Sequence, residues 1–342
     1  MARAVEERRT QMKRKAIALV SGGLDSLLAA KVIQEQGIEV QGVCFVMSAA
    51  AISVERFSRN VREAAGDAGI PVKVVDISKE FLAVLKSPKH GYGSQVNPCI
   101  DCKIFMLRKA KKMMKEERAG FVVTGEVLGE RPMSQRRDAL NIITKGAGLE
   151  GYLLRPLSAK LMEETVPEKE GAVDREKLLD INGRSRKRQF ELAEKYEIEK
   201  YFYPAGGCLL TDPAFSQKVK DLMKTGNLTA KNIDLLKYGR HFRLDNETKV
   251  VVGRDDKDNN AITGLKQEKD IVLRLKDKPG PYALLQGKKS EGHIKTAAAL
   301  VVSHSKAKKE KQAAVEFWAD EAKKEVIVAH SLKKDEMDKM RV

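Results

Sequence analysis

The sequence predicts an α/β fold built on a parallel sheet, followed by a smaller α+β domain at the C-terminal end. Three observations support this prediction. A short apolar run leads into a glycine pair and then into a helical repeat, and strands and helices continue to alternate along the first half of the chain. In the last third, short strand-like segments are separated by Asp, Asn, Gly and Pro. Alternating strands and helices are typical of a parallel sheet covered by helices on both faces, and closely spaced strands with turn residues indicate a separate β-rich domain.

The first elements form a strand–loop–helix–strand unit. Residues 16–20 are apolar, the apolar residues from Leu27 to Ile33 recur at helical spacing, and residues 39–46 have the composition of a second strand. This order is typical of a βαβ unit, whose strands are parallel. Further along, the pattern predicts a helix at 54–68, a strand at 71–75, a helix at 104–116 and a strand at 120–124.

The rest of the chain is less regular, and its composition changes twice. We expect a strand running into a loop at 153–157, helix and loop at 163–180, a helix at 185–197, strands at 242–252, 271–275 and 282–285, a helix at 295–311, and a hairpin of 313–318 with 325–329. The expected domains are a polar leader at 1–15, the α/β domain at 16–215, a linker helix region at 216–237, the second domain at 238–330 and a charged tail at 331–342.

Composition favours a polyanionic partner. The 342 residues include 64 Lys and Arg against 48 Asp and Glu, which gives a net charge of +16 and a potential that attracts nucleic acid. A merely basic soluble protein is the alternative. No segment approaches the roughly 18–20 apolar residues that span a bilayer, and the leader mixes both charges. We therefore expect a cytoplasmic protein with no membrane partner.

A glycine-containing loop joins the first strand to the first helix. Its sequence, Ser21-Gly22-Gly23-Leu24-Asp25-Ser26, lets backbone N–H groups approach phosphate oxygens, and the following helix N-terminus favours negative charge. A carboxylate at Asp25 fits such a loop if it orients the loop or helps to hold Mg²⁺ beside the phosphates. No Gly-Lys-Ser/Thr follows, so this is not a Walker A sequence. A chance glycine turn is the alternative.

Three cysteines form the second candidate feature. Cys99 and Cys102 make a CxxC pair, and Cys208 follows in a glycine-rich segment. Thiolates either bind a soft metal or carry sulfur as a persulfide, and buried inert thiols or a structural zinc site are the alternatives. Cys44 lies inside the strand expected at 40–46, where a small core residue is the simpler interpretation.

The SGGLDS loop after an apolar strand resembles the PP-loop of the ATP pyrophosphatases, the adenine nucleotide α-hydrolase-like superfamily. The resemblance implies a PP-loop α/β domain that cleaves ATP between the α and β phosphates with Mg²⁺, and a catalytic role for Asp25. The ATP-binding residues that it implies are Ser21, Gly22, Gly23, Leu24, Asp25, Ser26, Phe45 and Gly125.

The cysteine segment is similar to that of two tRNA thiolation families. The stretch from Asn97 to Cys102 resembles the Asn-Pro-Asp-x-x-Cys motif of the tRNA 2-thiouridylases, with Cys99 at the aspartate position. With this third cysteine the set resembles the three-cysteine pockets of the iron–sulfur-dependent tRNA thiolases. The resemblance implies a [4Fe-4S] cluster on Cys99, Cys102 and Cys208. The alternative that it makes less favoured is a persulfide on Cys208 with Cys102 as its catalytic partner. Residues 124–135 and 154–157 resemble the tRNA 4-thiouridine synthases, and the whole resemblance covers about residues 16–215.

The C-terminal third resembles the RNA-binding domain of the NFACT family. The resemblance rests on residues 239–243, on 249–255 and on the Asn259-Asn260 pair, and a small β-rich dimerisation domain is the alternative. The basic residues that we expect to contact RNA are Lys103, Arg131, Arg136, Arg137, Arg240, Arg243 and Arg254.

Together these features predict an ATP-dependent tRNA uridine thiolase. Its partners would be tRNA and a sulfur donor, either sulfide or a persulfide carrier protein, and a homodimer is one state that the sequence leaves open. Two other functions remain open at this point: a PP-loop ligase or amidotransferase for a small molecule, and an RNA- or ribosome-binding factor with a regulatory nucleotide site. The position of the modified uridine, and of the sulfur on its base, is not fixed by these residues.

Overall fold

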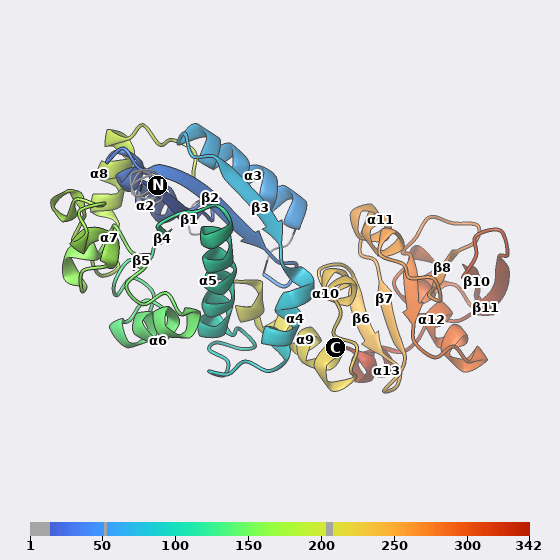
Figure 1. Cartoon of the computed structure of the whole chain (residues 1–342). Coiled ribbons are helices and arrows are strands. Elements are labelled where there is room, and N and C mark those ends of the chain that lie inside the picture. The colour runs from blue at the N-terminus through green and yellow to red at the C-terminus, as the bar shows by residue number, and fades with distance from the viewer. Residues whose placement is uncertain (1–13, 51–52, 203–207) are drawn as a thin grey trace. The chain divides into compact units, whose positions relative to one another are not determined.

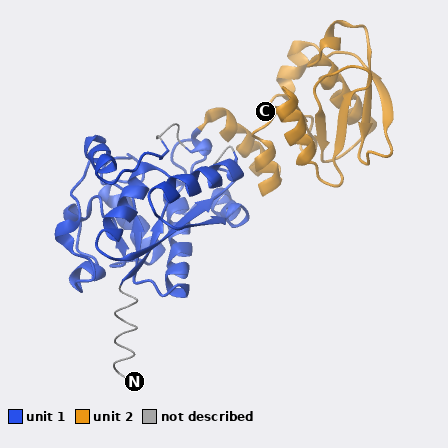
Figure 2. Ribbon diagram, turned by 90° about the horizontal axis from the view of Figure 1, so that it is seen from above, with its two compact units in different colours: residues 1–211 blue, residues 212–342 orange. Residues whose placement is uncertain are grey.

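The computed structural model of the chain describes residues 14–50, 53–202 and 208–342. It divides into two compact units, Met1–Thr211 and Asp212–Val342, which Figure 2 shows in blue and orange. Nearly all of the expected leader at 1–15 lies outside the described residues. The division falls just ahead of residues 216–237, so the helices of the expected linker region belong to the second unit.

The first unit is built on a five-stranded sheet with the order β3-β2-β1-β4-β5 (Figure 1). Every neighbouring pair of strands is parallel, with Ala18 opposite Gly42 of β2 and Val123 of β4. The predicted parallel sheet is therefore confirmed. Its strands are β1 (Lys15–Leu19), β2 (Glu39–Val46), β3 (Val72–Asp76), β4 (Phe121–Thr124) and β5 (Leu153–Leu154).

Helices cover both faces of this sheet. One face packs against α2 and α8, and the other carries α5, which contacts β1 and β4. The helices of the unit are α2 (Leu24–Gln34), α3 (Val54–Asp67), α4 (Ser78–Lys86), α5 (Cys99–Glu116), α6 (Arg137–Ala147), α7 (Val166–Lys169) and α8 (Lys187–Lys195), with short 3₁₀ turns at Ala159–Leu161, Arg175–Lys177 and Leu209–Thr211.

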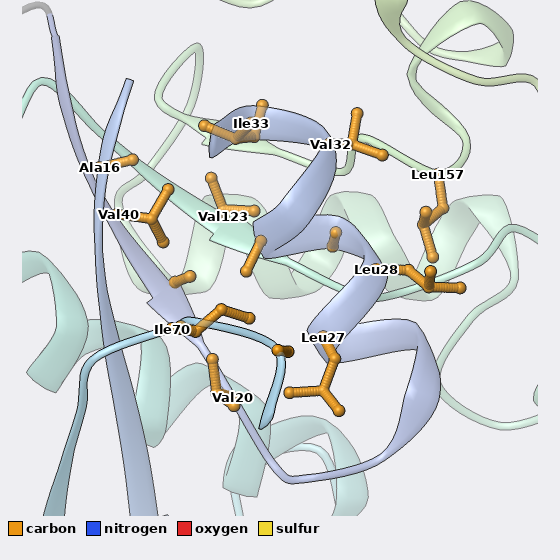
Figure 3. Packing of buried hydrophobic residues seen from close by; sticks show 14 of the residues in the cluster. Ala16, Val20, Leu27, Leu28, Val32, Ile33, Val40, Ile70, Val123 and Leu157 are labelled. Carbon is orange, nitrogen blue, oxygen red and sulfur yellow. The ribbon is translucent and has the colours of Figure 1, made fainter. Parts of the chain in front are cut away.

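The packing of α2 on the sheet fixes the position of the glycine-containing loop. Leu28 and Ile33 of α2 are fully buried, and they belong to one apolar cluster with Val40 of β2 and Val123 of β4 (Figure 3). Truncating a buried leucine of this kind costs about 2–5 kcal/mol. Because α2 follows β1 directly, this packing holds its N-terminus at the carboxyl ends of the strands, where parallel sheets place their ligand sites.

The second unit contains a six-stranded sheet with the order β11-β10-β8-β9-β7-β6, in which every pair is antiparallel. The α+β prediction is confirmed, as is the hairpin of Ala313–Trp318 with Glu325–Ala329. One face packs against α12, and the other carries the apolar residues of α10 and α11. The elements are α9 (Pro213–Lys224), α10 (Ala230–Leu235), β6 (Arg240–Arg243), β7 (Lys249–Val252), α11 (Asp256–Gly264), β8 (Ile271–Leu275), β9 (Ala283–Gln286), α12 (Glu291–Ser303), η4 (Lys306–Lys309), β10 (Ala313–Trp318), β11 (Glu325–Ala329) and α13 (Lys334–Met340).

Several boundaries differ from those expected. Helix α5 begins at Cys99 and not near residue 104, with Pro98 at its N-cap, so both cysteines of the CxxC pair lie in its first turn. The stretch expected as a strand at 242–252 forms two strands, because the turn between them carries the exposed residues Asp245, Asn246 and Glu247. Helix α6, which starts at Arg137, was not among the predicted elements.

The C-terminal segment packs onto the sheet of the second unit. Met337 and Met340 of α13 contact its apolar cluster, and Arg341 forms a β-bridge with Phe242 of β6. Within the described parts of the chain, no helix combines the length and the apolar character that crossing a membrane requires.

Candidate active site

A cavity of about 460 Å³ opens at the carboxyl ends of the parallel strands. Its wall combines the loop between β1 and α2, the end of β2, the first turns of α5 and the end of β4. The predicted ATP-binding residues that line it are Ser21, Gly23, Leu24, Asp25, Ser26, Phe45 and Gly125, and Cys99, Lys103, Arg131, Ser134, Gln135 and Arg186 lie on the same wall.

The loop is held in shape by its own serines. The Ser26 hydroxyl donates a 2.7 Å hydrogen bond to the Gly23 carbonyl and accepts one of 3.1 Å from the Ser21 N–H. Gly22 has a φ of +77°, and a Cβ there would lie 2.6 Å from the Phe202 ring. No side chain caps the first turn of α2 at Gly23, so backbone N–H groups at this helix end are available to an anion.

A second glycine lets β4 approach this loop. A Cβ on Gly125 would lie 2.4 Å from the Asp25 carbonyl oxygen, which no side chain tolerates. The glycine therefore allows the backbone at the end of β4 to pack directly on the first turn of α2. This contact fixes Asp25 relative to the sheet.

Asp25 faces the cavity with an incomplete ion pair. Its two carboxylate oxygens lie 3.5 and 3.4 Å from Nη2 of Arg186, at the N-cap of α8. Burial raises the pKa of Asp25, and the charges of Arg186 and Arg131 oppose that rise. Nearby, burial and the charge of Asp25 raise the pKa of Glu130, whose Oε2 is buried with no hydrogen-bond partner among the described residues.

A second carboxylate on the cavity wall, Glu126, is fully paired. Glu126 accepts a hydrogen bond of 2.9 Å from Nε of Arg155 and a short one from Nζ of Lys103. Burial alone would raise the pKa of Glu126, but the two cations more than offset it and lower that pKa to about 2. Arg155 is itself fixed by Thr144 and by the Leu140 carbonyl. The result is a lysine held at the cavity wall one helical turn beyond Cys99.

The predicted cysteines come together beside the cavity. Cys99 lines it, and Cys102 and Cys208 interact electrostatically with each other and with Cys99. Burial, and then the charges of Cys208 and Cys99, raise the pKa of Cys102. Burial likewise raises the pKa of Cys208, to about 11. Cys44, the expected core residue, is 3% exposed.

The chemistry of this donor set fits a soft cationic centre. Three thiolates in one buried region repel each other, and a metal or iron–sulfur cluster would offset that repulsion. Among the described residues, however, no three Cys, His, Asp or Glu side chains are arranged as a metal-binding group. Cys208 directly follows residues 203–207, which lie outside the described part of the chain.

Aromatic side chains form the apolar part of the wall. Phe57 of α3 and Phe202 stack with ring centroids 5.5 Å apart, and both line the cavity with Phe45. Flat apolar walls of this kind suit a nucleobase. Neither Phe57 nor Phe202 belongs to a recognisable motif. Phe202 is joined to the loop by a β-bridge with Gly23 and by its N–H, which donates to the Gly22 carbonyl at 2.8 Å.

The basic residues expected to contact RNA fall into two groups in the first unit. Lys103 and Arg131 line the cavity; Lys103 is partly buried there, and Arg131 is exposed. Arg136 and Arg137 lie outside it at the start of α6, where Arg136 is 3.3 Å from Asp138 and Arg137 donates to the Leu161 carbonyl.

In the second unit the three expected arginines differ in their pairing. Nε and Nη2 of Arg243 donate to Asp221 of α9 at 2.9 and 2.5 Å, which leaves little of this group for RNA. Arg254 pairs with Asp258 at 2.5 and 3.1 Å but is half exposed. Arg240 donates one long hydrogen bond, 3.4 Å, to the Gly253 carbonyl. Burial and the charges of Arg254 and Arg341 lower the pKa of Arg240, so positive charge is concentrated here.

Arg186 and Glu126 are among the site residues that were not predicted from the sequence. Arg186 lies 161 residues from its partner Asp25, and no motif connects them. Glu126 belongs to the segment at 124–135 that resembles the 4-thiouridine synthases, but nothing in that segment indicates its pairing with Lys103 and Arg155.

Comparison with known proteins finds a family match in each unit. Residues 11–166 match the family described as thiamine biosynthesis protein (ThiI), and residues 239–341 match the NFACT protein RNA-binding domain. The tRNA-specific 2-thiouridylase MnmA of Syntrophotalea carbinolica is 28% identical over 161 residues, 44% of this chain and 45% of the relative. A probable tRNA sulfurtransferase of Thermococcus kodakarensis is 30% identical over 152 residues, 44% of this chain and 39% of the relative.

A solved complex of a 4-thiouridine synthetase with RNA and bound ATP is 20% identical, with a TM-score of 0.34, covering 65% of this chain and 52% of that chain. Residues 11–166 are therefore similar to the ThiI family, and residues 239–341 to the NFACT RNA-binding domain. The chain spans less than half the length of either curated relative.

Proposed function

We propose that this chain, whose two units match the ThiI family and the NFACT RNA-binding domain, thiolates a uridine of tRNA with ATP. The observation that carries the proposal is the shared cavity: the phosphate-binding loop and Cys99 line one space, and Cys102 and Cys208 lie beside it. The ThiI family match at 11–166 includes the loop, Cys99 and Cys102, and the curated relatives named tRNA-specific 2-thiouridylase and tRNA sulfurtransferase each match 44% of the chain.

The first step is adenylation of the base. The uridine carbonyl oxygen at C2 or C4 forms a bond to the α phosphorus, the bond from that phosphorus to the bridging oxygen breaks, and pyrophosphate leaves with the electron pair. N3 of uracil is adjacent to both carbonyls and gives up its proton. Loop N–H groups of the first turn of α2 and the Lys103 ammonium stabilise the charge that develops on the phosphates.

Magnesium would bind through the nucleotide. Mg²⁺ is usually held by one or two carboxylates together with phosphate oxygens, and Asp25 with the nearby Glu130 offers such carboxylates. When bound, it would neutralise charge on the β and γ phosphates.

The second step replaces the activated oxygen by sulfur. A sulfur nucleophile attacks the activated carbon, AMP leaves with the former carbonyl oxygen, and N3 regains a proton. We favour a [4Fe-4S] cluster held by Cys99, Cys102 and Cys208, which would supply an open iron that presents sulfide. In the other route, a persulfide on Cys208 attacks the carbon, Cys102 then attacks the resulting disulfide, and a thiol reductant restores both thiols.

RNA binding would come from basic residues of both units. Arg136 at the start of α6 is two-thirds exposed, and Arg240, Arg254 and Arg341 concentrate charge on the second unit. The target base must leave its stack to reach a cavity at the end of the sheet, which requires firm contacts to the backbone. Arg240→Ala should weaken tRNA binding for all sequences and reduce the salt dependence of the affinity by about one phosphate contact.

The test is thiolation in vitro. Purified protein, unmodified tRNA, ATP, Mg²⁺ and sulfide are incubated without oxygen, and nucleosides are analysed by mass spectrometry. We expect a thiouridine with equal amounts of AMP and pyrophosphate. ATP–pyrophosphate exchange without tRNA would favour a small-molecule ligase, and no ATP turnover even with tRNA would favour an RNA-binding factor.

A second measurement separates the sulfur routes. Iron content and visible absorption are recorded on protein purified without oxygen, and Cys99→Ala is compared with the unaltered chain. Iron-free, colourless protein that still thiolates tRNA, or full activity of Cys99→Ala, would overturn the cluster.

A further inference from the structure

Arg186 is a cavity residue that neither the motifs nor the family matches assign. It lies at the N-cap of α8, outside the residues 11–166 that match the ThiI family. Its side chain is 16% exposed and reaches the wall of the cavity beside the phosphate-binding loop. Its guanidinium lies 5.7 Å from the centre of the Phe190 ring, which supports one face of the group.

The guanidinium is incompletely paired for a group so little exposed. Nη2 lies 3.4 and 3.5 Å from the two oxygens of Asp25, whereas charge-assisted hydrogen bonds of this type are about 2.7–2.9 Å long. Nε is buried and has no hydrogen-bond partner among the described residues. Burying such a donor without a partner is unfavourable, so the site is suited to an additional anion.

The position of Arg186 indicates which part of a nucleotide would supply this anion. Asp25 lies in the first turn of α2, where the phosphate-binding loop ends, and Gly125 packs against its backbone. Lys103 is on the side of the cavity that carries Cys99 and is already paired with Glu126. Arg186 is therefore held at the end of the loop through Asp25, and Lys103 lies one helical turn beyond Cys99. The charge of Arg131 also opposes the rise that burial causes in the pKa of Asp25.

We propose that Arg186 binds the β and γ phosphates of ATP and stabilises pyrophosphate as it leaves. This inference rests on the proposed adenylation. As the bond between the α phosphorus and the bridging oxygen breaks, negative charge grows on the β phosphate, and a planar guanidinium can contact two of its oxygens at once. Asp25 positions the guanidinium before ATP binds. When ATP binds, the guanidinium of Arg186 exchanges its long contacts to Asp25 for shorter contacts to phosphate oxygens.

Equilibrium binding provides the test, because it does not require thiolation. Arg186→Gln and the unaltered protein are titrated calorimetrically with ATP, with pyrophosphate and with AMP, each in the presence of Mg²⁺. We expect dissociation constants for ATP and pyrophosphate to rise ten- to a hundredfold, with AMP affinity changed less than threefold. The matched control is Arg188→Gln on the same helix, which removes an exposed pair with Asp180 and should change none of the three.

Two outcomes would overturn the proposal. One is an Arg186→Gln protein that keeps its melting temperature and binds pyrophosphate normally. The other is an equal loss of ATP and AMP affinity, which would mean that Arg186 only shapes the cavity. If Arg186→Gln does not fold, Arg186→Lys serves instead; it keeps the charge without the planar fork, and we expect a three- to tenfold weaker binding of pyrophosphate, with unchanged binding counting against the proposal.

The failure of adenylation would look different. Unaltered protein that binds ATP and pyrophosphate but adenylates no uridine would contradict the proposed function and leave the role of Arg186 intact. Unaltered protein that binds neither ligand would contradict both.

Discussion

The carboxylates Asp221 of the second unit and Asp25 of the first are paired differently. In the second unit Asp221 of α9 is bound by Arg243 of β6 at 2.9 and 2.5 Å and by Lys249 of β7 at 3.1 Å, so that helix and sheet are joined by short contacts. In the first unit the cavity carboxylate Asp25 is paired with Arg186 through long contacts of 3.4 and 3.5 Å and also interacts with Gln189. Short, saturated ion pairs such as those of Asp221 hold elements of the fold together. Charged groups that are only partly paired beside a cavity, such as Asp25 and Arg186, can bind a substrate.

The largest expected effect is at the saturated pair. Asp221→Asn removes the anion that offsets Arg243 and the nearly buried Lys249, and breaking a buried pair from one side costs about 3–5 kcal/mol. We expect faster hydrogen exchange at β6, β7 and α9, measured by mass spectrometry, with ATP affinity of the first unit unchanged. Exchange that stays unchanged there would show that the contacts contribute little to the fold.

The corresponding change at the cavity should affect activity and not stability. Asp25→Asn keeps the size of the side chain and removes a carboxylate whose pKa burial has raised, so the melting temperature should change by no more than about 2 °C. Thiolation of tRNA should fall by roughly 10²–10³-fold, the range for removing one group that stabilises a transition state. Normal turnover, measured as AMP release, would remove Asp25 from the mechanism.

The pairing of these charged groups is also what could not be predicted from the sequence. The βαβ unit and the final hairpin follow from local patterns of apolar residues and glycines, and the structure confirms them. The SGGLDS loop lies between β1 and α2 as the pattern indicates, and its binding of phosphate stays a prediction. The pairing of Arg243 with Asp221 could not be predicted, because α9 has no pattern that connects it to β6. Lys103 was expected on an RNA-binding face, and only the fold shows that Glu126 holds it at the cavity.

The saturated pair should also give the second unit a particular pH dependence. Burial outweighs the attraction of Asp221 and lowers the pKa of Lys249 to about 8, whereas an unfolded lysine titrates near 10.4. Between these values the unfolded chain binds more protons than the folded one, so this group increases stability as pH rises from 8 to about 10.4. Relative to Lys249→Met, protection of β7 amides from exchange should rise by up to about 3 kcal/mol over this range. A constant difference would show that Lys249 keeps its ordinary pKa.

The smallest expected effect concerns the ionisation of the Cys208 thiol beside the cavity. Burial raises the pKa of Cys208 to about 11, so in metal-free protein only about one thiol in a thousand is ionised at pH 8. Alkylation of Cys208 by iodoacetamide, followed by peptide mass spectrometry, should therefore accelerate about tenfold for each pH unit between 8 and 10. Cys44, which is 3% exposed and whose pKa burial raises to about 12, serves as the internal control and should stay unmodified. A rate for Cys208 that levels off below pH 9 would mean that a neighbouring cation stabilises its thiolate in the metal-free state, which would favour the persulfide route over the cluster.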